Sequence, residues 1–372
     1  MKIAIVTSGG AGRDGVHGTV PCLVWLIERL VRAGDEVHVF LLQQEPEPDS
    51  WTLRGATIHN AGRRRPKRDM LRQIADVHRA GRFDAIITLW SALAEGVAAF
   101  AGLRLGVPVL LYFGCGELAA LPDVNFGCQL SFRDRTLLRF AMARADIIVG
   151  QCGRVVERIK ARGYPAQRLP LGVAVDEWAP RAPRRRTPGA PARLLNVGHV
   201  TPVKDHRTLF EAVAGLKAEG IAFQLDCVGI DVAGDGAMAR RAIELGLADE
   251  VRFHGFMPHG DVRRLFEAAD LLVVSSRSED GPLVVLEAAI AGVPTVGTDV
   301  GHLAEWAPAA ARTVPAADAA ALTDALREVL SDENLRLDLA RRAQEKALAE
   351  DADATAEGFR ALIRKAIAAK GR

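Results

Sequence analysis

The most informative stretch of this 372-residue chain is SSRSEDGPLVVLEAAIAGVP, residues 275–294. The apolar run 270–275 that leads into it predicts a buried strand. A Gly-Pro loop follows, and the next residues predict a short helix that ends at Gly292, because Pro294 prevents its continuation. A buried strand that passes through a loop into a helix is the repeating unit of a doubly wound α/β sheet.

The same alternation continues through the second half of the chain. Residues 179–192 carry four prolines and four arginines, which predicts a surface linker without helix or central strand. After this linker, apolar runs predict strands at 193–197, 224–228, 251–254, 270–275 and 294–298. The helices expected between and after them lie at 206–218, 235–245, 261–268 and 283–291.

The first half of the chain shows a second series of the same kind. Strands are expected at 2–7, 36–42, 83–89, 108–113 and 146–150. A helix is expected to follow Thr19 and end at Gly34, and further helices at 68–80, 91–104 and 131–144. The alternation favours two doubly wound α/β units with parallel sheets.

We therefore expect a first domain over 1–178, a linker over 179–192 and a second domain over 193–349. The chain is Ala/Leu/Arg-rich and helical near its end, and a helix of about 350–372 is expected to pack back on the first domain. Open α/β sheets bind ligands at the carboxyl ends of their strands. Two such domains would face a central cleft.

Composition narrows the class of protein. Apolar residues make up 49% and charged residues 25%, as in folded globular proteins. The 48 Lys+Arg against 46 Asp+Glu leave a net charge of +2, which argues against a nucleic-acid partner. No apolar run reaches the roughly 18–20 residues of a membrane span. The five widely spaced cysteines include no C-x-x-C pair, which favours a reducing cytoplasm and predicts no metal site.

A glycine pattern after the first strand raises the alternative of dinucleotide binding. Gly10-x-Gly12-x-x-Gly15 matches the fingerprint of that site. However, the helix begins about four residues after Gly15, and the strand 36–42 does not end in the acidic residue that binds a ribose. We therefore expect a flexible loop that approaches a ligand, and no NAD.

The second half carries the candidate binding residues. The amides of Leu283 and Val284 begin a helix, where a partial positive charge suits a diphosphate. Glu287 is the only charge between 281 and 298, so it is expected to need a partner such as a ribose diol, or else to cap a neighbouring loop. Lys204 follows a strand at the ligand edge, where it would meet a phosphate or remain solvated.

The spacing of Glu279 and Glu287 is the E-x7-E of retaining glycosyltransferases, and the sequence resembles glycosyltransferase family 4. The resemblance implies the GT-B architecture of two Rossmann-like domains. The resemblance covers most of the chain, because other segments resemble motifs of this family in the same order. These segments are Gly18 through Gly34-Asp35-Glu36-Val37, residues 170–178, residues 197–199 with Lys204-Asp205-His206, residues 251–255 and residues 300–305.

The resemblance also implies roles for these residues. Lys204 and His199 would contact the donor diphosphate, Glu279 the transferred sugar and Glu287 the ribose hydroxyls. Lys204, Glu279 and His199 are thus the expected catalytic residues. The remaining members of the expected donor site are Pro282, Leu283, Val284, Gly18, Phe256 and Met257, of which the last two would flank the base.

Three departures from the family pattern stand out. His199 replaces the usual arginine, so that a permanent charge becomes a titratable one. His17 replaces the first of the paired glycines. No histidine occurs between 105 and 135, where many members carry one beside the sugar; Cys115 lies near that place and is expected to be a small buried side chain.

These observations predict a cytoplasmic, retaining hexosyltransferase that moves a sugar from a nucleoside-diphosphate sugar to a hydroxyl of a glycan, a lipid-linked or a small-molecule acceptor. The alternatives are an epimerase or phosphorylase of the same architecture and a non-catalytic nucleotide-sugar-binding protein. The basic stretch Arg63–Arg68 would touch an anionic membrane or acceptor, or form a solvated loop. The sequence identifies neither base, sugar, acceptor nor oligomeric state.

Overall fold

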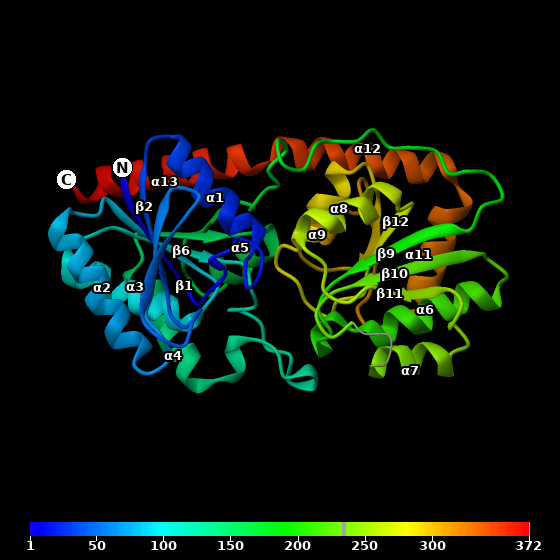
Figure 1. The fold of residues 1–372 in the computed structure, drawn as a ribbon, viewed down its shortest axis with the longest axis horizontal. Coiled ribbons are helices and arrows are strands. Elements are labelled where there is room, and N and C mark those ends of the chain that lie inside the picture. The colour runs from blue at the N-terminus through cyan, green and yellow to red at the C-terminus, as the bar shows by residue number, and fades with distance from the viewer. Residues whose placement is uncertain (233–235, 372) are drawn as a thin grey trace. The chain divides into compact units, whose positions relative to one another are not determined.

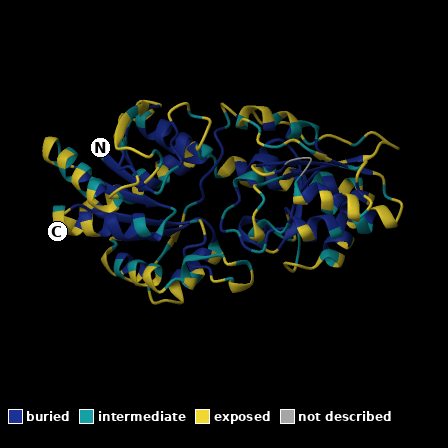
Figure 2. Ribbon diagram, turned by 60° about the horizontal axis from the view of Figure 1, so that its bottom comes forward, coloured by how far each residue is buried: buried dark blue, intermediate teal, exposed yellow. Residues whose placement is uncertain are grey.

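The computed structural model describes residues 1–232 and 236–371 and divides the chain into two compact units (Figure 1). The first unit combines Met1–Gly172 with Glu350–Arg372, and the second comprises Val173–Ala349. Each unit contains its own sheet with helices packed on it, and Figure 2 shows that burial concentrates in the strands and in the helix faces turned towards them. Two doubly wound α/β domains are thus confirmed.

The first unit contains an eight-stranded sheet in the order β3-β4-β2-β1-β5-β6-β7-β8, parallel except for the pair β3–β4. The central strands are apolar on both faces because helices cover both sides of the sheet. In register, Ile3 pairs with Val37 on one side and with Ala85 on the other. The strands are β1(Lys2–Thr7), β2(Glu36–Leu41), β3(Asp49–Leu53), β4(Ala56–Asn60), β5(Ala85–Leu89), β6(Val109–Phe113), β7(Ile147–Gly150) and β8(Gln167–Arg168).

The hairpin β3–β4 at one edge of this sheet is an element that the sequence analysis does not predict. Arg54 and Gly55 connect its strands, and both have left-handed backbones, with φ of 50° and 85°. Two such residues make the tight turn that suits the twist of a hairpin. The helices of the unit are α1(Pro21–Arg32), α2(Pro66–Ala80), α3(Ala92–Leu105), α4(Phe132–Arg144), α5(Gly153–Lys160) and α13(Ala352–Lys370).

The C-terminal helix α13 is anchored in the first unit by side-chain contacts. Thr355 Oγ1 donates to the carbonyl oxygen of Pro170 at 2.9 Å. Arg360 Nε donates to Asp35 Oδ2 at 3.0 Å, at the end of the turn that follows α1. These contacts and the apolar packing of α13 on α1 attach the end of the chain to the unit that begins it.

The second unit contains a six-stranded parallel sheet in the order β11-β10-β9-β12-β13-β14. The strand order reverses between β9 and β12, which creates a topological switch point at their carboxyl ends. The strands are β9(Ala192–Val197), β10(Phe223–Val228), β11(Val251–Phe253), β12(Leu271–Val274), β13(Thr295–Thr298) and β14(Arg312–Val314). The helices are α6(His206–Ala218), α7(Ala237–Glu244), α8(His259–Ala268), α9(Leu283–Ile290), α10(Gly301–Trp306), α11(Ala319–Ser331) and α12(Glu333–Ala349), with a 3-10 turn η3(Pro202–Lys204).

The helix ends of this unit differ slightly from those expected. Helix α8 begins two residues before the expected 261, directly after Pro258. Residue 235, the first of the expected helix 235–245, lies outside the described residues. In the two described ranges, no helix is long and apolar enough to cross a bilayer.

The Pro/Arg-rich stretch 179–192 lies within the second unit and is not a free linker. Its prolines keep residues 179–191 out of helices and strands, as expected, and β9 begins at Ala192. The amide of Arg181 donates to the carbonyl oxygen of Ile290 at 3.0 Å, and Arg186 Nη1 donates to that of Leu330 at 3.0 Å. Composition alone misses this packing, because it depends on carbonyl groups more than a hundred residues away.

Candidate active site

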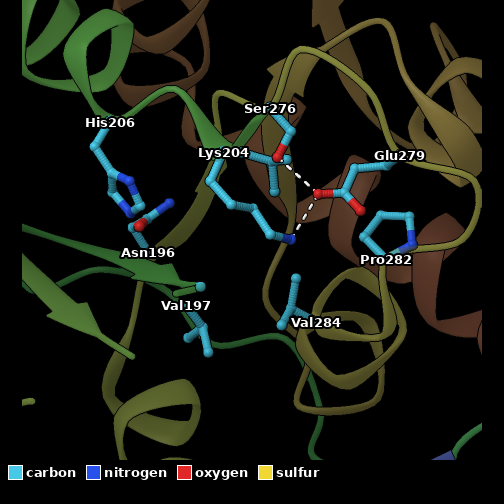
Figure 3. A pocket seen from close by; sticks show the side chains of 10 residues that line it. Asn196, Val197, Lys204, His206, Ser276, Glu279, Pro282 and Val284 are labelled. Carbon is cyan, nitrogen blue, oxygen red and sulfur yellow. Dashed lines mark hydrogen bonds and ion pairs between the residues drawn. The ribbon is translucent and has the colours of Figure 1, made fainter. Parts of the chain in front are cut away.

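A pocket lies at the switch point of the second unit, between the carboxyl ends of β9 and β12 (Figure 3). Open α/β sheets bind ligands at this position because the loops of the two strands diverge there. The pocket is lined by Asn196, Val197, Gly198, Lys204, His206, Val274, Ser276, Glu279, Pro282 and Val284. Four of the expected site residues, Lys204, Glu279, Pro282 and Val284, therefore lie together.

The centre of this pocket is an ion pair between Lys204 and Glu279. Lys204 Nζ lies 2.6 Å from Glu279 Oε1, and Ser276 Oγ donates to the same oxygen at 2.8 Å (Figure 3). The loop before α6 and the loop after β12 are also joined by their backbones, since the amide of Arg277 donates to the carbonyl oxygen of Val203 at 2.7 Å. Lys204 is therefore held by an ion pair at the sheet edge and remains partly accessible to solvent.

The loop that carries Glu279 is held in place from β13 and α10. Thr298 Oγ1 donates to the carbonyl oxygen of Ser276 at 2.6 Å. Gly301 has a left-handed backbone with φ of 47°, and a Cβ atom there would lie 2.9 Å from both the Asp280 carbonyl oxygen and Pro282 Cδ. Only glycine allows α10 to approach the loop this closely.

Helix α9 points its amino end at the same pocket. Pro282 occupies the N-cap position and has no side-chain acceptor for the first amides, which belong to Leu283 and Val284. The first amides of an α-helix lack intrahelical acceptors, and this end carries a partial positive charge. Lys204 and the end of α9 therefore bring two sources of positive potential to one pocket, which suits a phosphate group.

Glu287, by contrast, has a protein partner that the sequence analysis does not foresee. Glu287 is 3% exposed, and its Oε1 lies 2.6 Å from Nε2 of His259, the first residue of α8. The expectation that this buried carboxylate depends on a ligand for a hydrogen bond is wrong. The sequence could not show this contact, because it joins two helices 28 residues apart.

His199 follows β9, and its environment favours the neutral ring. Its Nδ1 accepts a hydrogen bond from the amide of Ile230 at 3.0 Å, so the proton of a neutral ring resides on Nε2. Partial burial and then the neighbouring Lys204 ammonium lower the pKa of His199, against a smaller opposing effect of Asp231. The structure by itself therefore offers a neutral N–H donor at this position, where the family pattern has a permanent charge.

Phe256 and Met257 lie in the loop between β11 and α8, and Phe256 is 45% exposed. This loop is tied to the neighbouring strand, because the amide of Gly229 donates to the Gly255 carbonyl oxygen at 2.9 Å. A Cβ atom at Gly229 would lie 2.1 Å from the Gly198 carbonyl oxygen. The loops that follow β9, β10 and β11 therefore lie side by side along one sheet edge.

Three further polar side chains of the pocket are absent from the expected site residues: Asn196, His206 and Ser276. Asn196 Nδ2 donates to the Val273 carbonyl oxygen at 2.9 Å and so joins β9 to β12. Burial and the Lys204 charge lower the pKa of His206 to about 4, and its Nε2 has no hydrogen-bond partner among the described residues. Within those residues, no group of three or more His, Cys, Asp or Glu side chains could hold a metal ion.

Comparison with known proteins assigns both units. A model described as "Glycosyl transferases group 1" matches residues 182–346, and one described as "Glycosyl transferase 4-like domain" matches 17–172. The 2-deoxystreptamine N-acetyl-D-glucosaminyltransferase of Streptomyces fradiae is 30% identical over 266 residues, 66% of this chain and 61% of that protein. A D-inositol 3-phosphate glycosyltransferase of Salinispora arenicola is 29% identical over 255 residues, 62% of this chain and 57% of that protein. The matches thus span less than two thirds of these relatives.

Solved structures agree over nearly the whole chain. Sucrose-phosphate synthase from Thermosynechococcus elongatus has a TM-score of 0.80 at 21% identity, with 99% of this chain and 100% of that chain covered. Anabaena HepE, solved with UDP and glucose, has a TM-score of 0.75 at 16% identity, with 98% and 100% covered. These likenesses show the GT-B fold, and each of the two units matches a glycosyltransferase family model.

In the first unit, the expected site residue Gly18 lies on the loop between β1 and α1, with φ of 61°. Gln44, just after β2, fixes this loop: its Nε2 donates to the Gly18 carbonyl oxygen at 3.1 Å, and its Oε1 accepts from the Gly10 amide at 2.8 Å. On the same loop, His17 Nδ1 lies 2.6 Å from Asp14 and helps to lower the pKa of Asp14 to about 2. Gln44 stands where an NAD-binding protein carries its acidic residue.

The loop after β6 corrects the expectation for Cys115, which is exposed and not buried. Glu117 Oε2 accepts from the amides of Gly114 and Cys115 at 3.1 and 2.9 Å, and this holds the backbone so that the thiol faces outward. Glu95 on α3 is another buried carboxyl residue of this unit that the sequence analysis does not single out. Burial and then the Glu117 charge raise the pKa of Glu95 well above its ordinary value.

Proposed function

We propose that this protein is a retaining glycosyltransferase of family 4 that transfers a sugar from a nucleoside-diphosphate sugar to an acceptor hydroxyl. The observation that carries the proposal is the Lys204–Glu279 pair at 2.6 Å, placed beside the amino end of α9 at the switch point. A cation and a helix terminus suit a diphosphate, and a carboxylate suits sugar hydroxyls.

In this proposal, the positive groups stabilise the leaving nucleoside diphosphate. Lys204 Nζ, the amides of Leu283 and Val284 and the Nε2–H of His199 would contact the phosphate oxygens. Negative charge grows on the diphosphate as its bond to the sugar breaks, so donors already in place lower the barrier. Lys204 and the helix terminus supply the positive charge that a metal ion gives in other transferases, and the proposal includes no metal.

Glu279 would turn from Lys204 to the hydroxyls of the transferred sugar when the diphosphate takes over the lysine. The motif residues include no nucleophile placed for a covalent intermediate, which supports a same-face substitution. In this step the bond from the anomeric carbon to the phosphate oxygen breaks and the acceptor oxygen bonds to the same face. The acceptor proton passes to the phosphate oxygen that leaves, so the anomeric configuration is retained.

The comparisons suggest the first compounds to test. HepE was solved with UDP and glucose, so UDP-sugars come first among donors, followed by GDP- and ADP-sugars. Two relatives are named for 2-deoxystreptamine and D-inositol 3-phosphate, which makes these two compounds the first acceptors. A donor at free concentration [L] that binds with dissociation constant Kd stabilises the folded protein by RT ln(1 + [L]/Kd) and so raises the melting temperature.

The decisive experiment is product analysis with the donor that gives the largest thermal shift. We expect acceptor-dependent release of the nucleoside diphosphate and a product whose anomeric proton coupling in NMR matches the donor configuration. An inverted product would exclude the retaining mechanism, sugar isomerised without acceptor would indicate an epimerase, and binding without turnover would indicate a non-catalytic protein.

Lys204→Ala tests the leaving-group model. A charge-assisted contact is worth about 2–3 kcal/mol, so kcat should fall roughly 30- to 150-fold while donor affinity falls less. Steady-state kinetics and calorimetry on the same preparation separate the two effects. Wild-type kcat in the variant would show that Lys204 does not act on the leaving group.

We also propose a cytoplasmic protein that makes peripheral contact with an anionic membrane surface through Arg63–Arg68. The four arginines and Lys67 of this stretch are exposed at the start of α2. Each such cation near an anionic surface contributes about 1 kcal/mol. Sedimentation with phosphatidylglycerol-containing vesicles should retain the wild type, and exchange of Arg63, Arg64, Arg65 and Lys67 for glutamine should release it; equal sedimentation of both would refute the contact.

A further inference from the structure

We propose that His259 is a positioning residue that holds Glu287 for recognition of the donor ribose. The inference rests on the proposed function, because it concerns the nucleotide half of the same donor. His259 Nε2 and Glu287 Oε1 are 2.6 Å apart, the length of a strong hydrogen bond to a carboxylate. A carboxylate has two oxygens, so the contact with His259 engages one and a ribose hydroxyl can donate to the other.

The tight burial of Glu287 makes this contact necessary. Glu287 is 3% exposed on α9, a helix whose other residues are all apolar. A buried carboxylate without hydrogen bonds costs several kcal/mol and takes up a proton instead. His259 supplies such a hydrogen bond at 2.6 Å, so the carboxylate is held in place before any nucleotide arrives.

The imidazole ring of His259 is itself fixed by Trp178. The two ring centroids are 4.8 Å apart with an interplanar angle of 31°. Trp178 also donates from Nε1 to the backbone carbonyl oxygen of Glu287 at 3.1 Å, and its ring packs edge-on against Phe266. Trp178 thus contacts both members of the pair and sets the side-chain orientation of one against the backbone of the other.

The position of His259 in the chain links two parts of nucleotide recognition. It follows the exposed Phe256 by three residues, with Pro258 between them at φ of −53°. Phe256 and Met257 are the residues proposed to flank the base. One short segment therefore carries both the base contact and the partner of the ribose-binding carboxylate, so that a shift of this loop changes both.

Two substitutions separate the hydrogen bond from the ring. His259→Gln keeps an N–H donor for Glu287 Oε1 and removes the ring, whereas His259→Phe keeps the ring against Trp178 and removes the donor. His254→Gln is the matched control, because His254 Nε2 makes a similar contact of 2.7 Å with Asp226 Oδ1 in the same unit. The probes are UDP and 2′,3′-dideoxy-UDP, with the corresponding GDP pair in parallel, measured by calorimetry.

We expect the wild type to prefer the ribonucleotide over its dideoxy counterpart by about 10- to 100-fold, the value of hydrogen bonds to a charged group. His259→Phe should reduce this ratio to about threefold or less, and His259→Gln and His254→Gln should retain most of it. An unchanged ratio in His259→Phe, or an equal loss in the Phe and Gln variants, would overturn the proposal. Absence of UDP, GDP and ADP binding by the wild type would instead refute the proposed function.

In His259→Phe, the Glu287 carboxylate loses its hydrogen-bond donor, which can destabilise the fold of the variant. A double-mutant cycle tests the proposal in that case too. Glu287→Gln removes the charge, and in the combined variant His259→Phe/Glu287→Gln neither charge nor its partner remains. If His259 acts through Glu287, the second substitution should change the ribose ratio by less than twofold beyond Glu287→Gln alone. Additive losses would show that His259 acts independently of Glu287.

Discussion

At the scale of single residues, Lys204 and Glu279 compensate each other's charge. Lys204 Nζ and Ser276 Oγ converge on Glu279 Oε1, so the carboxylate offsets part of the positive potential that a diphosphate would meet. In the proposed function, a bound nucleoside diphosphate would compete with Glu279 for the lysine. A carboxylate displaced in this way would be released for the sugar, so that one contact would couple the two roles.

Removing this competition gives a prediction in which affinity and turnover change in opposite directions. The pair is partly exposed, with side chains 29% and 15% accessible, so its contribution is about 1 kcal/mol or less. We expect Glu279→Gln to bind UDP about two- to fivefold more tightly by calorimetry and to transfer sugar at least tenfold more slowly. The tighter binding follows from the unopposed lysine, and the slow transfer from the lost carboxylate.

The control for this prediction is Glu211→Gln. Glu211 pairs with Arg207 at 2.9 Å in the same unit but does not line the pocket. A general effect of removing one negative charge would strengthen UDP binding equally in both variants. Weaker UDP binding by Glu279→Gln would mean that Glu279 positions Lys204 and does not compete for it.

His199 leads to a prediction about pH. Partial burial and Lys204 hold its pKa below the ordinary 6.5, and protonation of Nδ1 would break its hydrogen bond with the Ile230 amide. The ring is then neutral throughout pH 7 to 9 and its titration adds no slope in this window. UDP affinity of the wild type should run parallel to that of His199→Gln from pH 7 to 9. If bound phosphates raise the pKa above 7 instead, only the wild type will lose affinity as the pH rises through it.

At the scale of elements, the site depends on how closely α10 approaches the loop that carries Glu279. We expect Gly301→Ala to weaken UDP binding about three- to tenfold, because the new Cβ would press on Asp280 and Pro282 at 2.9 Å. Gly246→Ala is the control: Gly246 also has a left-handed backbone, with φ of 70°, but nothing lies within 4 Å of its Cβ. Both variants should lose about 1–2 kcal/mol of stability from backbone strain. Equal UDP affinities would show that the loop tolerates the displacement.

An element can be predicted from the sequence when neighbouring residues determine it, and is missed when contacts with distant residues determine it. Strands such as β1 and β12 are buried on both faces, so their apolar runs identify them directly. The hairpin β3–β4 is half-exposed at a sheet edge, and its turn at Arg54-Gly55 leaves only a weak local pattern. The packing of 179–192 depends on distant carbonyl groups, which composition cannot reveal.

The same distinction applies to the site. The strand-loop-helix pattern places Glu279 and the amino end of α9 at one sheet edge, and the switch point brings Lys204 to them from 75 residues away. Topology alone therefore predicts this meeting. The partner of Glu287 depends on the rotation and starting residue of α8, which begins two residues earlier than the sequence indicates. A contact between side chains on two helices has no signature in a single sequence.

At the scale of the whole molecule, each unit has a buried apolar core, and the first unit also buries an ionisable carboxyl group. Glu95 is fully buried, and neither carboxyl oxygen has a hydrogen-bond partner in the two described ranges. Burial and the Glu117 charge raise the pKa of Glu95 well above its ordinary 4.5, so the folded protein holds a proton that the unfolded chain releases. Its contribution to stability is therefore fully present below pH 4.5 and is lost as the pH rises towards the raised pKa.

Glu95→Gln replaces this acid with a neutral side chain of the same size. We expect the free energy of unfolding of the variant, relative to the wild type, to increase by about 1.4 kcal/mol per pH unit above 4.5, until the raised pKa is reached. Urea denaturation at several pH values between 4.5 and 8 measures this difference, and other titrating groups cancel in it. Glu157→Gln is the control, since the Glu157 side chain is 71% exposed and should give a difference that does not change with pH. A pH-independent difference for Glu95→Gln would mean that Glu95 is ionised in the folded protein and that its environment supplies a compensating charge.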